Sequence, residues 1–173
     1  MEYSFTLRYQ LSPDDNNPDA LVERLYEAGC DDVIVGTGVA GRIAVAFDRD
    51  AESAMDAIMS ALADIKRAIP SAMLIEAAPD LVGLTDIADA IGMSRQNMRK
   101  LMIGHPESFP PPVHEGASSL WHLREVLLWM SKNSYEIERT LIETASTTMQ
   151  VNLAMRVRDV SPAMERRFRP LVA

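Results

Sequence analysis

The first 78 residues alternate between strand-like and helix-like hydrophobic periods, and this order restricts the fold more than any other feature of the chain. Where every second residue is apolar, the pattern predicts a strand with one buried face. The strand-like segments are "YSFTLRYQL" (3–11), "CDDVIVGTG" (30–38), "GRIAVAFDRD" (41–50) and "SAMLIEAAP" (71–79). Where apolar residues recur every three or four positions, the pattern predicts an amphipathic helix. The helix-like segments are "PDALVERLYEAG" (18–29) and "AESAMDAIMSALADIKRAIP" (51–70).

The resulting order, β-α-β-β-α-β, is that of the split βαβ or ferredoxin-like arrangement. It predicts an α+β protein whose first unit, residues 1–78, is a four-stranded antiparallel sheet with both helices on one face. "PDLVGL" (79–84) then separates this unit from a second, all-helical pattern, because a proline and a glycine interrupt both periods there.

Charge is distributed unevenly along the chain. The net charge is −8, and residues 1–78 alone hold 14 acids and 6 bases, a balance of −8. Such a surface repels phosphate backbones. In contrast, no Asp or Glu occurs between Asp89 and Glu107, and three bases lie in that window. Any contact with a polyanion is therefore expected in the second half of the chain.

Several features favour a protein of the cytoplasm. We see no basic leader with an apolar core at the N-terminus and no apolar run of about 20 residues, so we expect neither a signal peptide nor membrane insertion. The single Cys30 excludes an intrachain disulfide framework and suits a reducing compartment. We expect Cys30 to be a small core residue.

The window "LTDIADAIGMSRQNMRKL" (84–101) has the spacing of a helix-turn-helix. Helices are expected at 85–91 and 94–103, with Ala88 as the small residue that faces the second helix. Gly92 supplies a turn residue that tolerates positive φ. Thr85 and Ser94 stand where N-caps are expected. The apolar residues between the two helices are Ile87, Ile91, Met98 and Leu101.

The second of these helices has the side chains that recognise DNA bases. Arginine binds guanine with two hydrogen bonds, and glutamine or asparagine binds adenine in the same way. We therefore expect double-stranded DNA as the partner, with this helix in the major groove. The predicted contact residues of the helix are Ser94, Arg95, Gln96, Asn97, Arg99 and Lys100.

The segment that follows resembles the excisionase and MerR-like winged helix-turn-helix family. In that family an "FP-x-P" segment, a short hairpin that ends in an aromatic residue, and a helix beginning near "R-x-E-V" follow the recognition helix. The matching residues here are Phe109-Pro110-Pro111-Pro112, a turn near Gly116, Trp121 and Arg124-Glu125-Val126.

This resemblance covers about residues 80–131 and implies a DNA-binding module, so we expect a winged helix-turn-helix domain over residues 80–132. It also implies that His114, Ser118 or Ser119 on the wing approach the DNA backbone or minor groove. The wing departs from the family pattern because it has Glu115, and no basic residue precedes Arg124.

Residues 134–160 contain neither Pro nor Gly and are predicted to form one long helix, followed by a loose tail at 161–173. An apolar stripe from Ile142 to Val160 follows the helical period and has few partners in so small a domain. We expect this helix to make a homodimer, which fits a bacterial-type transcriptional regulator on a two-fold DNA site. A protein partner or a small-molecule effector at the N-terminal unit is left open.

Two alternatives come from other functional classes. The acidic N-terminal unit suits an adaptor or antitoxin that masks a basic protein. "GTGVAG" (36–41) matches the dinucleotide motif G-x-G-x-x-G, but a β-rich segment follows it where that motif requires a helix. We find no Ser-His-Asp, Cys-His or P-loop set and no zinc-like spacing among His105, His114 and His122. We therefore expect no enzyme, no cofactor and no metal site.

Overall fold

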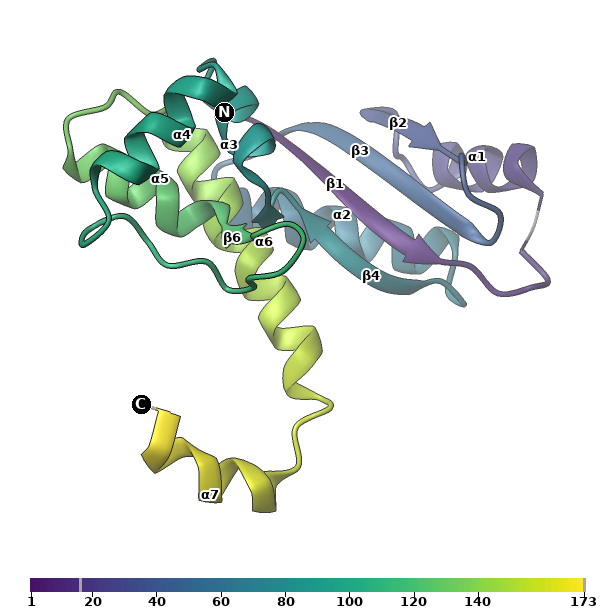
Figure 1. Ribbon diagram of the computed structural model, residues 1–173. Coiled ribbons are helices and arrows are strands. Elements are labelled where there is room, and N and C mark those ends of the chain that lie inside the picture. The colour runs from purple at the N-terminus through teal and green to yellow at the C-terminus, as the bar shows by residue number, and fades with distance from the viewer. Residues whose placement is uncertain (16, 173) are drawn as a thin grey trace.

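The computed structural model describes residues 1–15 and 17–172. The described part contains seven helices and six strands. Figure 1 shows their mixed α+β architecture, which confirms the predicted class. Strands and helices alternate through residue 78 in the predicted order. Their bounds are β1 Glu2–Gln10, α1 Pro18–Glu27, β2 Val33–Gly36, β3 Arg42–Asp50, α2 Ala54–Ala68 and β4 Met73–Ala78.

These strands form one antiparallel sheet in the order β2-β3-β1-β4. The alternation in β1 places Tyr3, Phe5, Leu7 and Tyr9 on one buried face, and the register sets Phe5 opposite Phe47 of β3. Their rings stack with centroids 5.1 Å apart. Both α1 and α2 pack against this face, so the apolar stripes of the helices and the sheet close a first core. Cys30 is fully buried in it, as expected.

The glycine-rich segment at 36–41 joins two strands. Gly36 ends β2, β3 begins at Arg42, and the two strands pair antiparallel. Gly41 has a φ of +73°, a conformation that side chains with a Cβ rarely adopt. A strand, β3, follows the third glycine where the dinucleotide motif requires a helix, so the segment is a hairpin connection.

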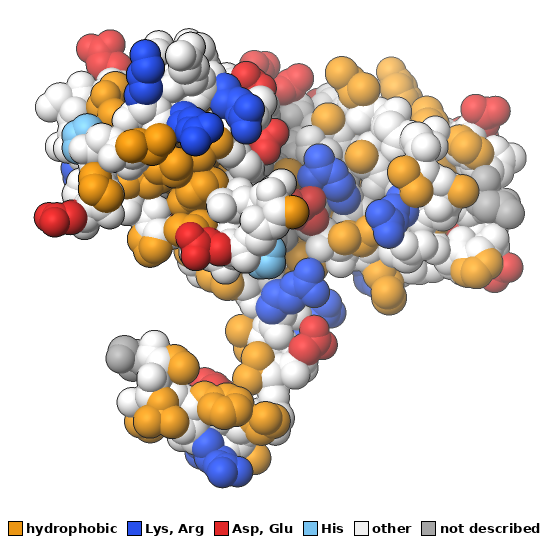
Figure 2. All heavy atoms as spheres, viewed as in Figure 1, with side chains coloured by type: hydrophobic (Ala, Val, Ile, Leu, Met, Phe, Trp, Pro, Cys, Tyr) orange, Lys and Arg blue, Asp and Glu red, His pale blue; other side chains and the backbone are white. Residues whose placement is uncertain are grey.

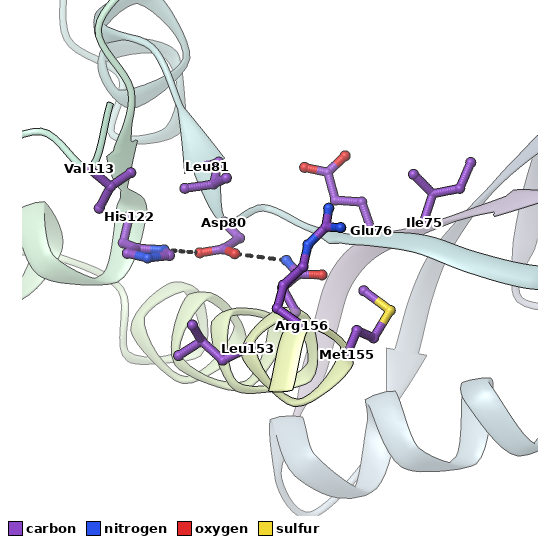
Figure 3. Close-up of a pocket in the computed structure, with 10 residues that line it drawn as sticks. Ile75, Glu76, Asp80, Leu81, Val113, His122, Leu153, Met155 and Arg156 are labelled. Carbon is purple, nitrogen blue, oxygen red and sulfur yellow. Dashed lines mark hydrogen bonds and ion pairs between the residues drawn. The ribbon is translucent and has the colours of Figure 1, made fainter. Parts of the chain in front are cut away.

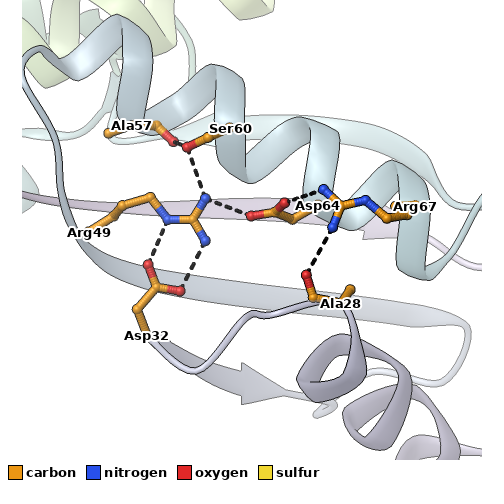
Figure 4. A network of polar contacts seen from close by, with 7 residues as sticks. All are labelled: Ala28, Asp32, Arg49, Ala57, Ser60, Asp64 and Arg67. Carbon is orange, nitrogen blue, oxygen red and sulfur yellow. Dashed lines mark hydrogen bonds and ion pairs between the residues drawn. The ribbon is translucent and has the colours of Figure 1, made fainter.

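A buried charge network ties this first core together (Figure 4). The guanidinium of Arg49 donates to both carboxylate oxygens of Asp32, at 2.6 and 3.0 Å, and also to Asp64 and to Ser60. Arg67 donates to the second oxygen of Asp64. Only 10% of the Arg49 side chain is exposed, so this ion pair lies largely out of water. No local sequence pattern predicts this network, because Asp32, Arg49 and Asp64 lie 15 to 32 positions apart.

A second core contains the elements between residues 81 and 132. These are β5 Leu81–Val82, α3 Leu84–Ala90, α4 Arg95–Gly104, β6 Trp121–His122 and α5 Leu123–Lys132. Strands β5 and β6 pair antiparallel. Trp121 and Trp129 are buried, and Phe109 packs edge-on against both rings. The indole of Trp121 donates to the carbonyl of Pro110, which anchors the proline-rich segment.

Helix α6, Arg139–Val157, packs against both cores, which corrects the expectation that its stripe lacks partners in the chain. Ala145 is fully buried in the second core, and Val151 packs on the first. Asn152 caps the edge of β4 by accepting from the Ala77 N–H and donating to the Ala77 carbonyl, both at 2.8 Å. An edge strand exposes such backbone groups unless something covers them, so α6 protects this edge.

The chain after α6 also differs from the prediction. The predicted long helix at 134–160 is shorter at both ends, since α6 spans Arg139–Val157, and residues Pro162–Val172 form a separate helix, α7. Figure 1 shows α7 projecting away from both cores, and all of its residues are exposed. The predicted loose tail is therefore helical. Among the described residues, no helix combines the length and apolar character needed to cross a membrane.

Candidate nucleic-acid interface

The two short helices of the predicted helix-turn-helix pack closely against each other. Ile87 and Ala88 of α3 and Met98 of α4 are fully buried in the second core. Ala88 is thus the small residue at the contact, as the spacing predicts. These buried residues share the second core with residues of α5, and the remaining side chains of α4 are mostly exposed.

The turn between the helices depends on Gly92. Its φ is +66°, and the next residue, Met93, donates its N–H to the carbonyl of Ala88 at 2.8 Å. An L-residue in this conformation places its Cβ too close to its own backbone. The predicted role of Gly92 is therefore confirmed.

We expect Gly92→Ala to lower the free energy of unfolding by about 1–2 kcal/mol, because alanine is strained at this positive φ. Gly104→Ala is the matched control, since Gly104 lies in α4 with an ordinary φ and open space around an added Cβ. The free energy of unfolding of this control should equal that of the wild type or exceed it by up to about 1 kcal/mol. Urea denaturation measures both. Equal effects of the two changes would contradict this role for Gly92.

Helix α4 begins with a free, electropositive end. The Ser94 hydroxyl oxygen accepts from the Asn97 N–H at 3.2 Å, which confirms the predicted N-cap. No acidic residue lies in its first turn, so the helix dipole favours an anion there. The other predicted cap, Thr85, is wrong: α3 begins after Gly83, whose N–H donates to the Asp86 carboxylate at 2.9 Å.

The predicted contact residues of α4 share one exposed surface. Arg95, Gln96, Asn97, Arg99 and Lys100 are all exposed. Within the described chain, none of the three bases forms an ion pair. Figure 2 shows basic side chains gathered over this part of the molecule, with acidic side chains at the margin. The cations are therefore available to a polyanion.

The wing residues lie in the loop between α4 and β6. The backbones of His114 and Leu120 bond to each other in an isolated bridge, so the loop does turn back near Gly116. His114 and Ser118 are exposed, and Ser119 is half-buried. In Figure 1, however, α4 forms the upper edge of this unit while the loop runs along its lower edge to β6. The wing loop and α4 therefore lie at different edges of this unit.

One polar cluster in the structure was not predicted from the sequence. Asp80 is almost fully buried and accepts from His122 Nδ1 at 2.6 Å and from Asn152 Nδ2 at 2.7 Å. These residues lie 42 and 72 positions from Asp80, and no local pattern connects them. A buried carboxylate requires hydrogen-bond partners, but sequence alone does not say which ones.

Comparisons with protein-family models, with curated proteins and with solved structures found no match to this chain. In the part of the chain that the structure describes, no group of three or more His, Cys, Asp or Glu side chains is placed to hold a metal ion.

Proposed function

We propose that this protein is a cytoplasmic, nucleoid-associated transcriptional regulator that binds specific DNA sequences by placing α4 in the major groove. The observation that carries the proposal is the surface of α4: an exposed helix with three unpaired cations and two amides, in an otherwise acidic protein. Arg95 and Gln96 stand in the first turn, from which recognition helices contact base edges.

The proposal extends to the finer arrangement of the two cores. The strand order β2-β3-β1-β4 with two helices on one face supports a ferredoxin-like N-terminal unit. Helices α3, α4 and α5 with the β5–β6 pair support a winged helix-turn-helix, in which α4 is the recognition helix. We assign the base contacts to α4 alone, because Figure 1 separates the wing loop from its outward side.

Selection of genomic fragments on the purified full-length chain, at about physiological salt, tests the function directly. We expect one recurrent sequence with two related half-sites about one helical turn apart. A gel shift on that site should show a modest dependence on salt, because few cations are available to displace counterions. Fragments without a recurrent sequence, or no retention at this salt concentration, would contradict the proposal.

We also propose that two copies associate through the C-terminal helices. Val157 ends the apolar stripe of α6 beyond the cores and Val160 follows the helix, and these two residues are 67% and 46% exposed. On α7, Met164, Phe168 and Leu171 lie on one face and are exposed. A single chain leaves this apolar surface in water, whereas a second copy would bury it.

The matching prediction concerns Phe168→Ser combined with Leu171→Ser. This variant should elute as one chain, whereas the wild type should elute as two, because the apolar face of α7 is lost. Size-exclusion chromatography with light scattering gives the masses. The control is Val22→Ser with Tyr26→Ser, two exposed apolar residues on α1, and it should remain a dimer. A monomeric wild type would refute association through α7.

The outer face of α1 favours a second candidate function, an adaptor or antitoxin that binds a basic protein. Val22 and Tyr26 are exposed there beside the acids Asp19, Glu23 and Glu27. A stoichiometric basic protein that co-purifies with the chain, together with no DNA shift, would support this function in place of gene regulation.

A further inference from the structure

A half-open pocket of about 390 Å³ lies between the two cores (Figure 3). Its walls come from β4, from β5 and β6, from the wing loop and from the last turns of α6. This volume lies in the range of sites for small molecules. The apolar lining consists of Ile75, Leu81, Val113, Leu153 and Met155.

One end of the pocket holds a fixed imidazole. The Asp80 side chain, 1% exposed, accepts a hydrogen bond from Nδ1 of His122. Since a carboxylate only accepts, this bond places a proton on Nδ1, and in the neutral ring Nε2 is then left without a proton. Asn152 holds the other oxygen of Asp80, so the pair is fixed from both sides. Nε2 of His122 has no hydrogen-bond partner among the described residues and is available as an acceptor.

The other end holds a cation. Figure 3 shows the Arg156 side chain reaching from α6 toward β4, on the opposite side of Asp80 from His122. Within the described residues, Arg156 forms no ion pair. The carboxylate of Glu76, which also lines the pocket, already pairs with Arg8 at 2.7 Å. Arg156 is therefore free to bind an anionic group.

We propose that this pocket binds a small carboxylic acid with an apolar body and one N–H or O–H donor. The carboxylate pairs with Arg156, the donor bonds to His122 Nε2, and the apolar body lies between them against Leu81 and Leu153. Such an occupant contacts both cores and α6 at once. The proposal concerns the pocket itself and holds whether or not the chain binds DNA.

Calorimetric titration of the full-length chain with indole-3-propionate tests the charge at the Arg156 end. This probe has a carboxylate, an apolar ring and one N–H donor. Arg156→Gln should weaken its binding by about 10-fold or more, because a charge-assisted hydrogen bond is lost. Arg158→Gln removes the same charge two residues further along the chain. Arg158 does not line the pocket, so this change should leave binding unchanged. Indole-3-propanol, which lacks the carboxylate, should bind wild type and Arg156→Gln equally weakly.

The His122 end is tested on the ligand side, which leaves the buried Asp80 pair intact. 1-Methylindole-3-propionate lacks the N–H donor and should bind about 2–10-fold more weakly than the parent acid. Equal affinity of the two acids would overturn the role of His122. Equal affinity of Arg156→Gln and wild type, or no saturation below about 1 mM, would overturn the site.

Discussion

Replacing Arg95 and Arg99 together with alanine should weaken binding to the selected DNA site by about 30-fold or more. Each arginine that bonds to a base edge contributes about 1–3 kcal/mol of discrimination, and about 1.4 kcal/mol corresponds to tenfold in affinity. Both side chains are exposed and unpaired, so the fold should not depend on them. Gel shifts at constant salt measure the loss, and thermal melting confirms that the variant stays folded.

The control for this pair removes the same charge elsewhere. Arg42→Ala with Arg166→Ala also deletes two exposed cations, and neither residue lies on α4 or in a described ion pair. This control should change affinity only slightly, through the long-range field. If both double variants lose affinity equally, Arg95 and Arg99 contribute to DNA binding only through their nonspecific charge. If Arg95 and Arg99 can be removed without loss, α4 is not the recognition helix.

Replacing Arg49 with methionine should lower the free energy of unfolding by about 3–5 kcal/mol at neutral pH, because the largely buried carboxylate of Asp32 loses its ion-pair partner and Asp64 keeps only Arg67. Arg8→Met is a matched control, since Arg8 also lies on a strand of the same sheet. Its pair with Glu76 is much more exposed, so the control should cost less than about 1 kcal/mol. Urea denaturation measures both values. Similar losses for the two variants would contradict a special role for Arg49.

The dependence of this effect on pH has a definite sign. Hydrogen bonds from Arg49 hold the pKa of Asp32 below its ordinary value in the folded protein. A carboxyl group whose pKa is lowered by folding contributes stability above its unfolded pKa and loses that contribution as pH falls through the folded pKa. The difference between wild type and Arg49→Met should therefore be full at pH 7 and shrink below about pH 4. A difference that grows on acidification would refute this account.

The sequence by itself determined the features of the fold that depend only on residues close together in the chain. Strand and helix periods predicted the order of the first 78 residues, because alternation and the helical repeat are local consequences of backbone geometry. The turn of the candidate interface was predictable for the same reason: Gly92 and Ser94 satisfy requirements that lie within a few residues of each other. Local signals for α7 were also present, since Pro162 stands at a first helical position and the apolar spacing follows.

The tertiary structure decided every feature that joins distant segments. Asp32 meets Arg49, and Asp80 meets His122 and Asn152, only after the sheet and α6 are in place. The apolar stripe of α6 shows most clearly how far a sequence pattern can predict burial. Its period predicts a buried face, but a period does not say what covers that face. Folding buries Ala145 inside the chain and leaves Val157 exposed, because burial depends on which surfaces meet in space.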